Sequence, residues 1–243
     1  MNPFDKIDDP RRRLLIEALA LGFFTAGIPA GSAWAQAFGS RPSKLPPGQS
    51  IYRITGTVTV NGQPATLKTQ IQLGDTVETG PGSEVIFVVG GHSMIVRADS
   101  RLTIEGDRNA ASPVISALRL ITGKLLSVSR RTPMQVTTGT ATIGIRGTGW
   151  YAESDPGQTY FCTCYGASEV AAINDPASKE LVVTTHHDRP VYILAKAPQG
   201  RSIRNAPFIN HTDQELLLIE TLVGRAPPFV FPKEDYGGPR RDY

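Results

Sequence analysis

Most of the chain beyond residue 50 alternates between apolar and polar residues in short runs. This period of two is typical of β-strands with one buried face. The clearest run is residues 67–73, with leucine and isoleucine on one face and lysine and glutamine on the other. Asn61-Gly62 before it predicts a type I′ hairpin turn, and Gly74-Asp75 after it predicts another corner. The further runs are residues 84–89, 93–98, 102–105, 116–129, 134–138, 141–145, 149–153, 159–165, 169–173, 181–185 and 191–194.

These strands predict an all-β fold, either solenoid-like or a sandwich, with many short strands and one C-terminal helix. The chain holds 24 glycines and 19 prolines, which supply the turns that such a fold needs. No fixed repeat length is visible, so the periodicity alone leaves both architectures open. We expect the β domain to span residues 51–195.

A helix interrupts the alternation near the C-terminus. Thr212 and Glu215 have the spacing of a capping box, an apolar stretch follows, and Gly224 can end the helix. We expect residues 196–231 to form a cap, with the helix near residues 213–223 packed on the sheet or over its edge. The tail, residues 232–243, is rich in glycine and charge and is predicted to be disordered.

The N-terminus resembles an export signal. Residues 1–37 have a basic start ending in Arg11-Arg12-Arg13, an apolar run, and small residues that allow cleavage after Ala35 or Ala37. The consecutive arginines favour the twin-arginine route, which exports folded proteins. The alternative is an uncleaved single anchor, because the apolar run is near the lower limit for a membrane span. After cleavage no stable membrane span is expected, and residues 38–50, which are rich in proline, are predicted to be a linker.

The charge pattern argues against a nucleic-acid partner. The chain has 25 basic and 22 acidic residues, a formal charge of +3. The basic residues are scattered, and the dense cluster Arg11-Arg12-Arg13 lies in the predicted signal, whereas phosphate binding selects clustered lysine and arginine.

Several motifs of the β region resemble the FecR-domain family of bacterial periplasmic proteins. They follow one another in the family's order over roughly residues 51–150, and the string that ends in Arg146-Gly147-Thr148 is the most specific. The main motifs are residues 73–80 (LGDTVETG), 100–104 (SRLTI), 123–125 (GKL) and 141–148 (ATIGIRGT).

The resemblance implies an all-β domain located in the periplasm. The best-known members are anchored regulators that pass a signal from an outer-membrane receptor to a sigma factor. A predicted export signal stands here where those proteins carry their sigma-binding region, so the anti-sigma activity is not carried over. We therefore expect a non-enzymatic binding, scaffolding or sensing module whose partner is an envelope protein or glycan. Arg146 is read as a structural ion pair, with contact to a ligand as its alternative.

Two cysteines and three histidines are candidate metal ligands. Cys162 and Cys164 are two residues apart on one predicted strand, so both sulfurs point to the same face. If the strand that ends at His186-His187 pairs antiparallel with it, one of these histidines approaches the sulfurs, and His211 can supply a further ligand. Such a set suits zinc or copper.

Other interpretations of the cysteines remain open from sequence. They can be small buried apolar residues, take part in intermolecular or transient disulfides, or serve thiol-redox chemistry. No serine elbow, HExxH helix, phosphate loop or dinucleotide motif occurs in the sequence. An enzyme acting on cell-wall polysaccharide is therefore the weakest alternative.

Overall fold

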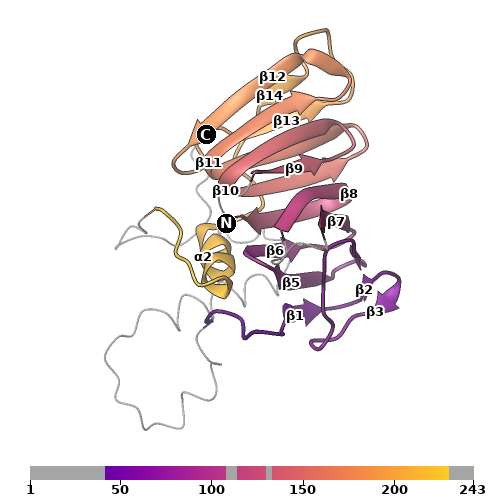
Figure 1. The fold of residues 1–243 in the computed structure, drawn as a ribbon. Helices are drawn as coiled ribbons and strands as arrows, with labels where there is room; N and C mark the ends of the chain where they lie inside the picture. Colours follow the sequence, from indigo (N-terminus) through magenta and orange to yellow (C-terminus); the bar gives the residue numbers. More distant parts are fainter. Residues whose placement is uncertain (1–41, 108–113, 130–132, 230–243) are drawn as a thin grey trace, which may run out of the picture. The chain divides into compact units, whose positions relative to one another are not determined.

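The fold is described from a computed structural model, which covers residues 42–107, 114–129 and 133–229 (Figure 1). The chain divides into two units, Met1–Ser43 and Lys44–Tyr243, and the described strands and helix all belong to the second. The fourteen described strands are β1 (Ile51–Thr55), β2 (Val58–Val60), β3 (Gln63–Pro64), β4 (Thr76–Thr79), β5 (Glu84–Val89), β6 (His92–Val96), β7 (Arg101–Asp107), β8 (Val114–Val128), β9 (Pro133–Thr137), β10 (Ala141–Asp155), β11 (Gln158–Ala172), β12 (Asp175–Thr184), β13 (Val191–Leu194) and β14 (Ile203–Asn205). One helix, α2 (Asp213–Leu222), follows them, which confirms the predicted all-β class with a C-terminal helix.

The strands form one hydrogen-bonded network that folds into two layers, because three long strands contribute to both. Among the described strands, every pairing is antiparallel except that of β8 with β9. The helix-side layer has the order β1-β5-β6-β8-β10-β11-β13-β14, using residues 123–128 of β8, 149–155 of β10 and 158–165 of β11. The far layer has the order β3-β2-β4-β7-β8-β9-β10-β11-β12, using residues 114–122, 141–146 and 166–172 of the same strands.

A glycine with positive φ lies where each long strand passes from one layer to the other. These are Gly123 in β8 (φ 89°), Gly147 in β10 (φ 63°) and Gly166 in β11 (φ 94°). Residues with a Cβ rarely adopt this conformation, so glycine lets each strand change its direction and its pairing partners without ending. The three glycines therefore make the two-layer arrangement accessible to this chain.

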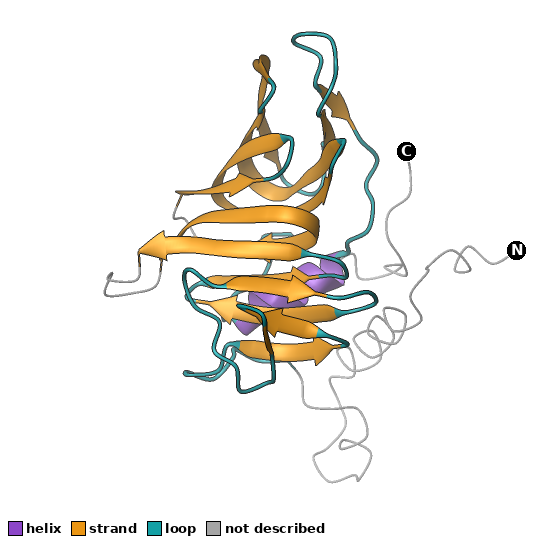
Figure 2. Ribbon diagram, turned by 90° about the vertical axis from the view of Figure 1, so that its right-hand side faces the viewer, coloured by secondary structure: helices purple, strands orange, loops and turns teal. Residues whose placement is uncertain are grey.

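Alternation along the helix-side layer separates two apolar cores. In β5, Val85 and Phe87 face the far layer, whereas Ile86 faces α2. In β6, Met94 likewise faces the far layer and Ile95 faces α2. The helix-side layer is thus buried on both faces, with α2 lying against it (Figure 2). This explains why β5 reads as a nearly continuous apolar run.

The run at residues 67–73 is not a strand, contrary to the prediction. The backbone N–H groups of Thr66 and Gln72 donate to the side chains of Thr69 and Asp75 (2.9 and 2.8 Å), so local turns replace a strand ladder. Leu67 is accordingly exposed. The turn at Asn61-Gly62 is confirmed, because both residues have positive φ and join β2 to β3.

Two pairs of runs predicted as separate strands are single strands. Residues 141–145 and 149–153 both belong to β10, and residues 159–165 and 169–173 belong to β11 except for the last residue. The intervening glycines, read as turns in the sequence, bend these strands without ending them.

The C-terminal helix begins with the predicted capping box. The Thr212 side chain accepts from Glu215 N, and the Glu215 side chain accepts from Thr212 N. Leu45, within the predicted linker, packs in the same core as the helix, and its N–H donates to Leu222 O (2.9 Å). The predicted signal (1–37) and tail (232–243) lie outside the described residues. Within the described ranges, no helix has the length and apolar character needed to cross a membrane.

Replacing Gly123 with alanine should destabilise the fold strongly. A Cβ there would lie 2.4 Å from Ser100 Cα, in addition to the strain of its positive φ. Gly62→Ala is the matched control, since Gly62 also has positive φ but nothing within 4 Å of the added Cβ. We expect the control to lose about 1–2 kcal/mol in urea unfolding. Gly123→Ala should lose at least about 1 kcal/mol more from overpacking, and equal losses would contradict the packing described here.

Candidate metal centre

Four buried side chains from three segments meet beneath α2. Cys162 and Cys164 lie on β11, His187 follows β12, and His211 lies just before α2. Their sulfur and ring nitrogen atoms all lie within 4.8 Å of one another. We call these four residues the Cys-His cluster, and they come from parts of the sequence up to 49 residues apart, counting from Cys162 to His211.

A local irregularity in β11 places Tyr165 on the same face as both cysteines. Thr163 pairs with Trp150 but Tyr165 pairs with Gly149, so Cys164 is an extra residue in the ladder. Cys162, Cys164 and Tyr165 consequently all pack in the core that faces α2. Gly149 is required here, because a Cβ on it would lie 2.5 Å from the Tyr165 ring.

The loop after β12 places both neighbouring histidines against one carboxylate. His187 has positive φ (54°), and its N–H donates to Cys164 O (2.9 Å). Its Nε2 lies 2.9 Å from Asp213 Oδ1, and His186 Nε2 lies 2.8 Å from Asp213 Oδ2. Adjacent residues of an extended strand point to opposite faces, but both rings reach Asp213 here because the positive φ of His187 breaks the extended geometry.

His211 is held by a backbone carbonyl two residues before it and by aromatic rings. Its Nδ1 lies 2.7 Å from Ile209 O, and its ring stacks on Tyr151 with centroids 4.5 Å apart. Phe208 contacts the rings of both His187 and His211. The cluster is therefore enclosed by apolar and aromatic groups.

The hydrogen bonds determine which ring nitrogens carry a proton. Ile209 O can only accept, so Nδ1 of His211 carries hydrogen and its Nε2 presents a lone pair. Asp213 likewise requires hydrogen on His187 Nε2, which leaves the lone pair of a neutral His187 on Nδ1. These two nitrogens lie 3.1 Å apart, and His187 Nδ1 is 3.5 Å from Cys162 Sγ. Two lone pairs that face each other at this distance repel, and a proton or a metal ion between them removes the repulsion.

The cluster also shifts the proton affinities of its members. Burial disfavours the Cys162 thiolate, but the hydrogen bond with Cys164 and the two imidazoles lower the pKa of Cys162 well below its ordinary value. Burial and the neighbouring Cys162 raise the pKa of Cys164. Burial opposes a charge on His187, yet Asp213 and Cys162 raise its pKa to about 9, whereas burial lowers the pKa of His211. A thiolate at Cys162 is thus favoured, and thiolate is the form that binds metals.

The sequence candidates divide into two places in the fold. Cys162, Cys164, His187 and His211 come together, and His186 lies beside them on Asp213. The Arg146 side chain is 68% exposed and makes an ion pair with Glu169 (3.8 Å), and Gly147 forms the corner of β10. The side chain of Thr148 lies outside the described residues.

Sequence reasoning missed the charged contacts that hold α2. Arg97, after β6, makes a partly buried ion pair with Glu215 (2.8 Å). At the other end of the helix, Glu220 accepts from Arg225 and from the Tyr165 hydroxyl. Asp213 was missed as the partner of both histidines. The only available signal was the presence of acidic residues in the helix, which does not identify partners so distant in sequence.

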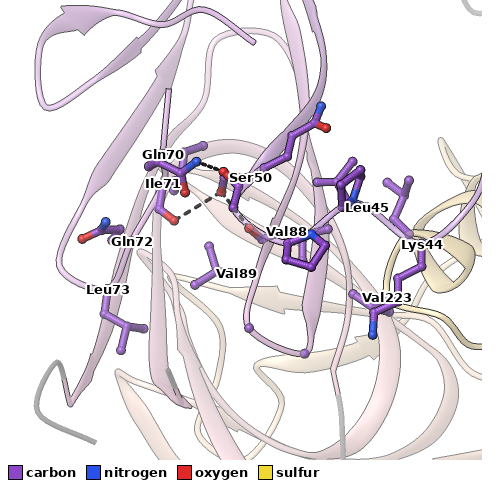
Figure 3. A pocket seen from close by; sticks show the side chains of 17 residues that line it. Lys44, Leu45, Ser50, Gln70, Ile71, Gln72, Leu73, Val88, Val89 and Val223 are labelled. Atoms are coloured by element: carbon purple, nitrogen blue, oxygen red, sulfur yellow. Dashed lines mark hydrogen bonds between the residues drawn. The ribbon is translucent and has the colours of Figure 1, made fainter. Parts of the chain in front are cut away.

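A separate cavity of about 740 Å³ opens between residues 44–50, 70–73 and 88–91 and the end of α2 (Figure 3). The Ser50 hydroxyl lies 2.8 Å from Val88 O and 3.3 Å from Ile71 O. Lys44 is the one charged residue among those that line it, and no member of the Cys-His cluster lines it. The cavity therefore lacks the convergent titratable groups expected of a reactive site.

A protein-family model matches most of the β region. The model described as "FecR protein" matches residues 75–167. The chain contains a FecR domain. This confirms the resemblance inferred from the motifs. The FecR domain includes the three corner glycines and both cysteines, whereas His187, His211 and α2 lie beyond it.

Two solved structures of a putative anti-sigma factor from Parabacteroides distasonis are also similar to the chain. Each is 12% identical, with TM-scores of 0.44 and 0.43, and each match covers 54% of this chain and 58% of the other. The chain thus spans less than two thirds of those proteins, and the likeness is too distant to extend the family match. No curated protein sequence matches the chain.

Breaking the ion pair of Arg97 with Glu215 at the start of α2 should destabilise the fold. Arg97→Met leaves the Glu215 carboxylate without its main cation, and we expect a loss of about 3–5 kcal/mol in the free energy of unfolding. Arg101→Met is the matched control, because the pair of Arg101 with Glu78 is exposed and should be worth about 1 kcal/mol or less. Chemical denaturation measures both, and a small effect at Arg97 would contradict its role in holding the helix.

Proposed function

We propose that the chain is an exported FecR-domain module that works in the periplasm by binding, as a sensing or scaffolding component, without catalysing a reaction. The observation that carries the proposal is the FecR domain at residues 75–167. FecR domains are known from signalling proteins of the bacterial envelope, which supports a sensing role. The partner is an envelope protein or a glycan.

The geometry of the cluster supports binding over catalysis. Its four residues are buried, with exposed fractions from 0% to 5%, so a polymeric substrate does not reach the sulfurs. The separate cavity, between residues 44–50, 70–73 and 88–91, is lined mainly by backbone and uncharged side chains. A cell-wall hydrolase would need a pair of carboxyl groups flanking its substrate, and neither place supplies one among the described residues.

Export can be tested on the arginines of the leader. Replacing Arg11, Arg12 and Arg13 together with lysine keeps the positive charge but removes the twin-arginine feature. We expect the variant to stay in the cytoplasm as full-length precursor, and the wild type to be found in the periplasm beginning at Gln36 or Phe38. Fractionation with mass spectrometry of the intact protein measures this. A wild-type protein that keeps Met1 or Asn2 and stays in the cytoplasm would contradict export.

Binding can be tested by crosslinking in the native envelope. A photoreactive residue at the exposed Arg146 position should give a discrete adduct with an envelope component. The same residue at Val183, also exposed but on the edge strand β12, is the control for nonspecific capture. Identical adducts at both positions, together with turnover of peptidoglycan by the purified protein, would contradict a non-enzymatic binding module.

A further inference from the structure

We propose that Cys162, Cys164, His187 and His211 bind one zinc ion, and that this ion fastens the start of α2 to β11. The inference is independent of the proposed role of the FecR domain. It rests on the donor atoms, their spacing and the groups that surround them.

The spacing fits a tetrahedral ion. Zinc lies about 2.3 Å from thiolate sulfur and about 2.0 Å from imidazole nitrogen in a tetrahedral site. From these lengths, two nitrogens should be about 3.3 Å apart, and a nitrogen and a sulfur about 3.5 Å apart. His187 Nδ1 lies 3.1 Å from His211 Nε2 and 3.5 Å from Cys162 Sγ. These three ligand atoms are thus already near the spacing that the ion requires, and Cys164 Sγ lies within 4.8 Å of each of them.

The surrounding groups orient both imidazoles as ligands. Metal-bound histidines usually donate their other ring N–H to a carboxylate or a carbonyl. His187 does so to Asp213 and His211 to Ile209 O. The two lone pairs that remain converge on the space shared with the sulfurs, so the outer contacts of a metal site are present as well as its ligands.

Charge balance favours a divalent ion. Binding releases two protons to solvent, one from the Cys164 thiol and one held between Cys162 and the facing imidazoles. Two thiolates with Zn²⁺ then form a neutral group, as burial requires. Cu⁺ in the same place would leave a negative charge buried near the Asp213 carboxylate. Two thiolates and two imidazoles also match the ligand preferences of zinc.

The position of the ion explains its structural role. His211 is two residues before α2, and Asp213 is the first residue of the helix, whereas both cysteines lie on β11. One ion therefore joins the helix-side layer to the start of the helix. His187 adds the loop after β12 to the same point.

Metal analysis of the purified full chain tests the proposal. We expect about one zinc per wild-type chain after gel filtration, and less than about one tenth in the Cys162→Ser and Cys164→Ser double variant. His92→Gln is the matched control, because His92 is the one histidine outside the two neighbouring groups of candidate ligands, and its variant should retain about one zinc.

A second measurement tests the proposal on wild-type protein, so its result does not depend on whether the cysteine variant folds. Wild-type chain stripped of metal and loaded with Co²⁺ should show thiolate-to-cobalt charge-transfer bands and the intense visible bands of tetrahedral cobalt. His211→Cys should retain them, whereas His211→Phe should weaken binding of Co²⁺ and Zn²⁺ by at least about tenfold. Wild-type protein without stoichiometric zinc and without these cobalt bands would overturn the proposal, and stoichiometric copper would overturn the choice of ion.

Discussion

The rest of the structure depends on covering the outer face of the helix-side layer. Ile86, Ile95, Leu126 and Tyr151 point away from the core between the layers and would meet water without α2. The helix covers them with leucines and an isoleucine, but Asp213 and Glu220 of the helix are then buried too. Burying such groups is unfavourable unless they are paired. The ion pairs of Arg97 and Arg225 and the Asp213 contacts to two histidines meet that requirement.

The need to cover this outer face also links the FecR domain to the segment that follows it. The domain match ends at residue 167, within β11, so the domain supplies the apolar face and both cysteines. The residues beyond it supply His187, His211 and the covering helix. A β scaffold of a known family and a C-terminal segment thus meet at one buried cluster. The buried position of the cluster leaves the outer surfaces of the proposed binding module for contact with its proposed partner.

Local sequence predicted the features that depend on neighbouring residues. The capping box of Thr212 and Glu215 and the shared face of Cys162 and Cys164 are both set within three residues. Features set by distant residues were missed. Gly147 and Gly166 suggest turns in sequence but bend continuous strands, because the pairing partners on either side differ. The contact of His187 with Asp213 and that of Arg97 with Glu215 join residues 26 and 118 positions apart, beyond any local pattern.

The Cys-His cluster is where the covering helix meets β11, and a bound ion there would fasten the start of α2 to the helix-side layer. Hydrogen exchange of the full chain, followed by mass spectrometry with zinc and after chelation, tests this fastening. We expect chelation to speed exchange in residues 211–222 and around Cys162, while β7 in the far layer keeps its protection. Unchanged exchange in α2 after chelation, or an equal increase in both layers, would contradict it.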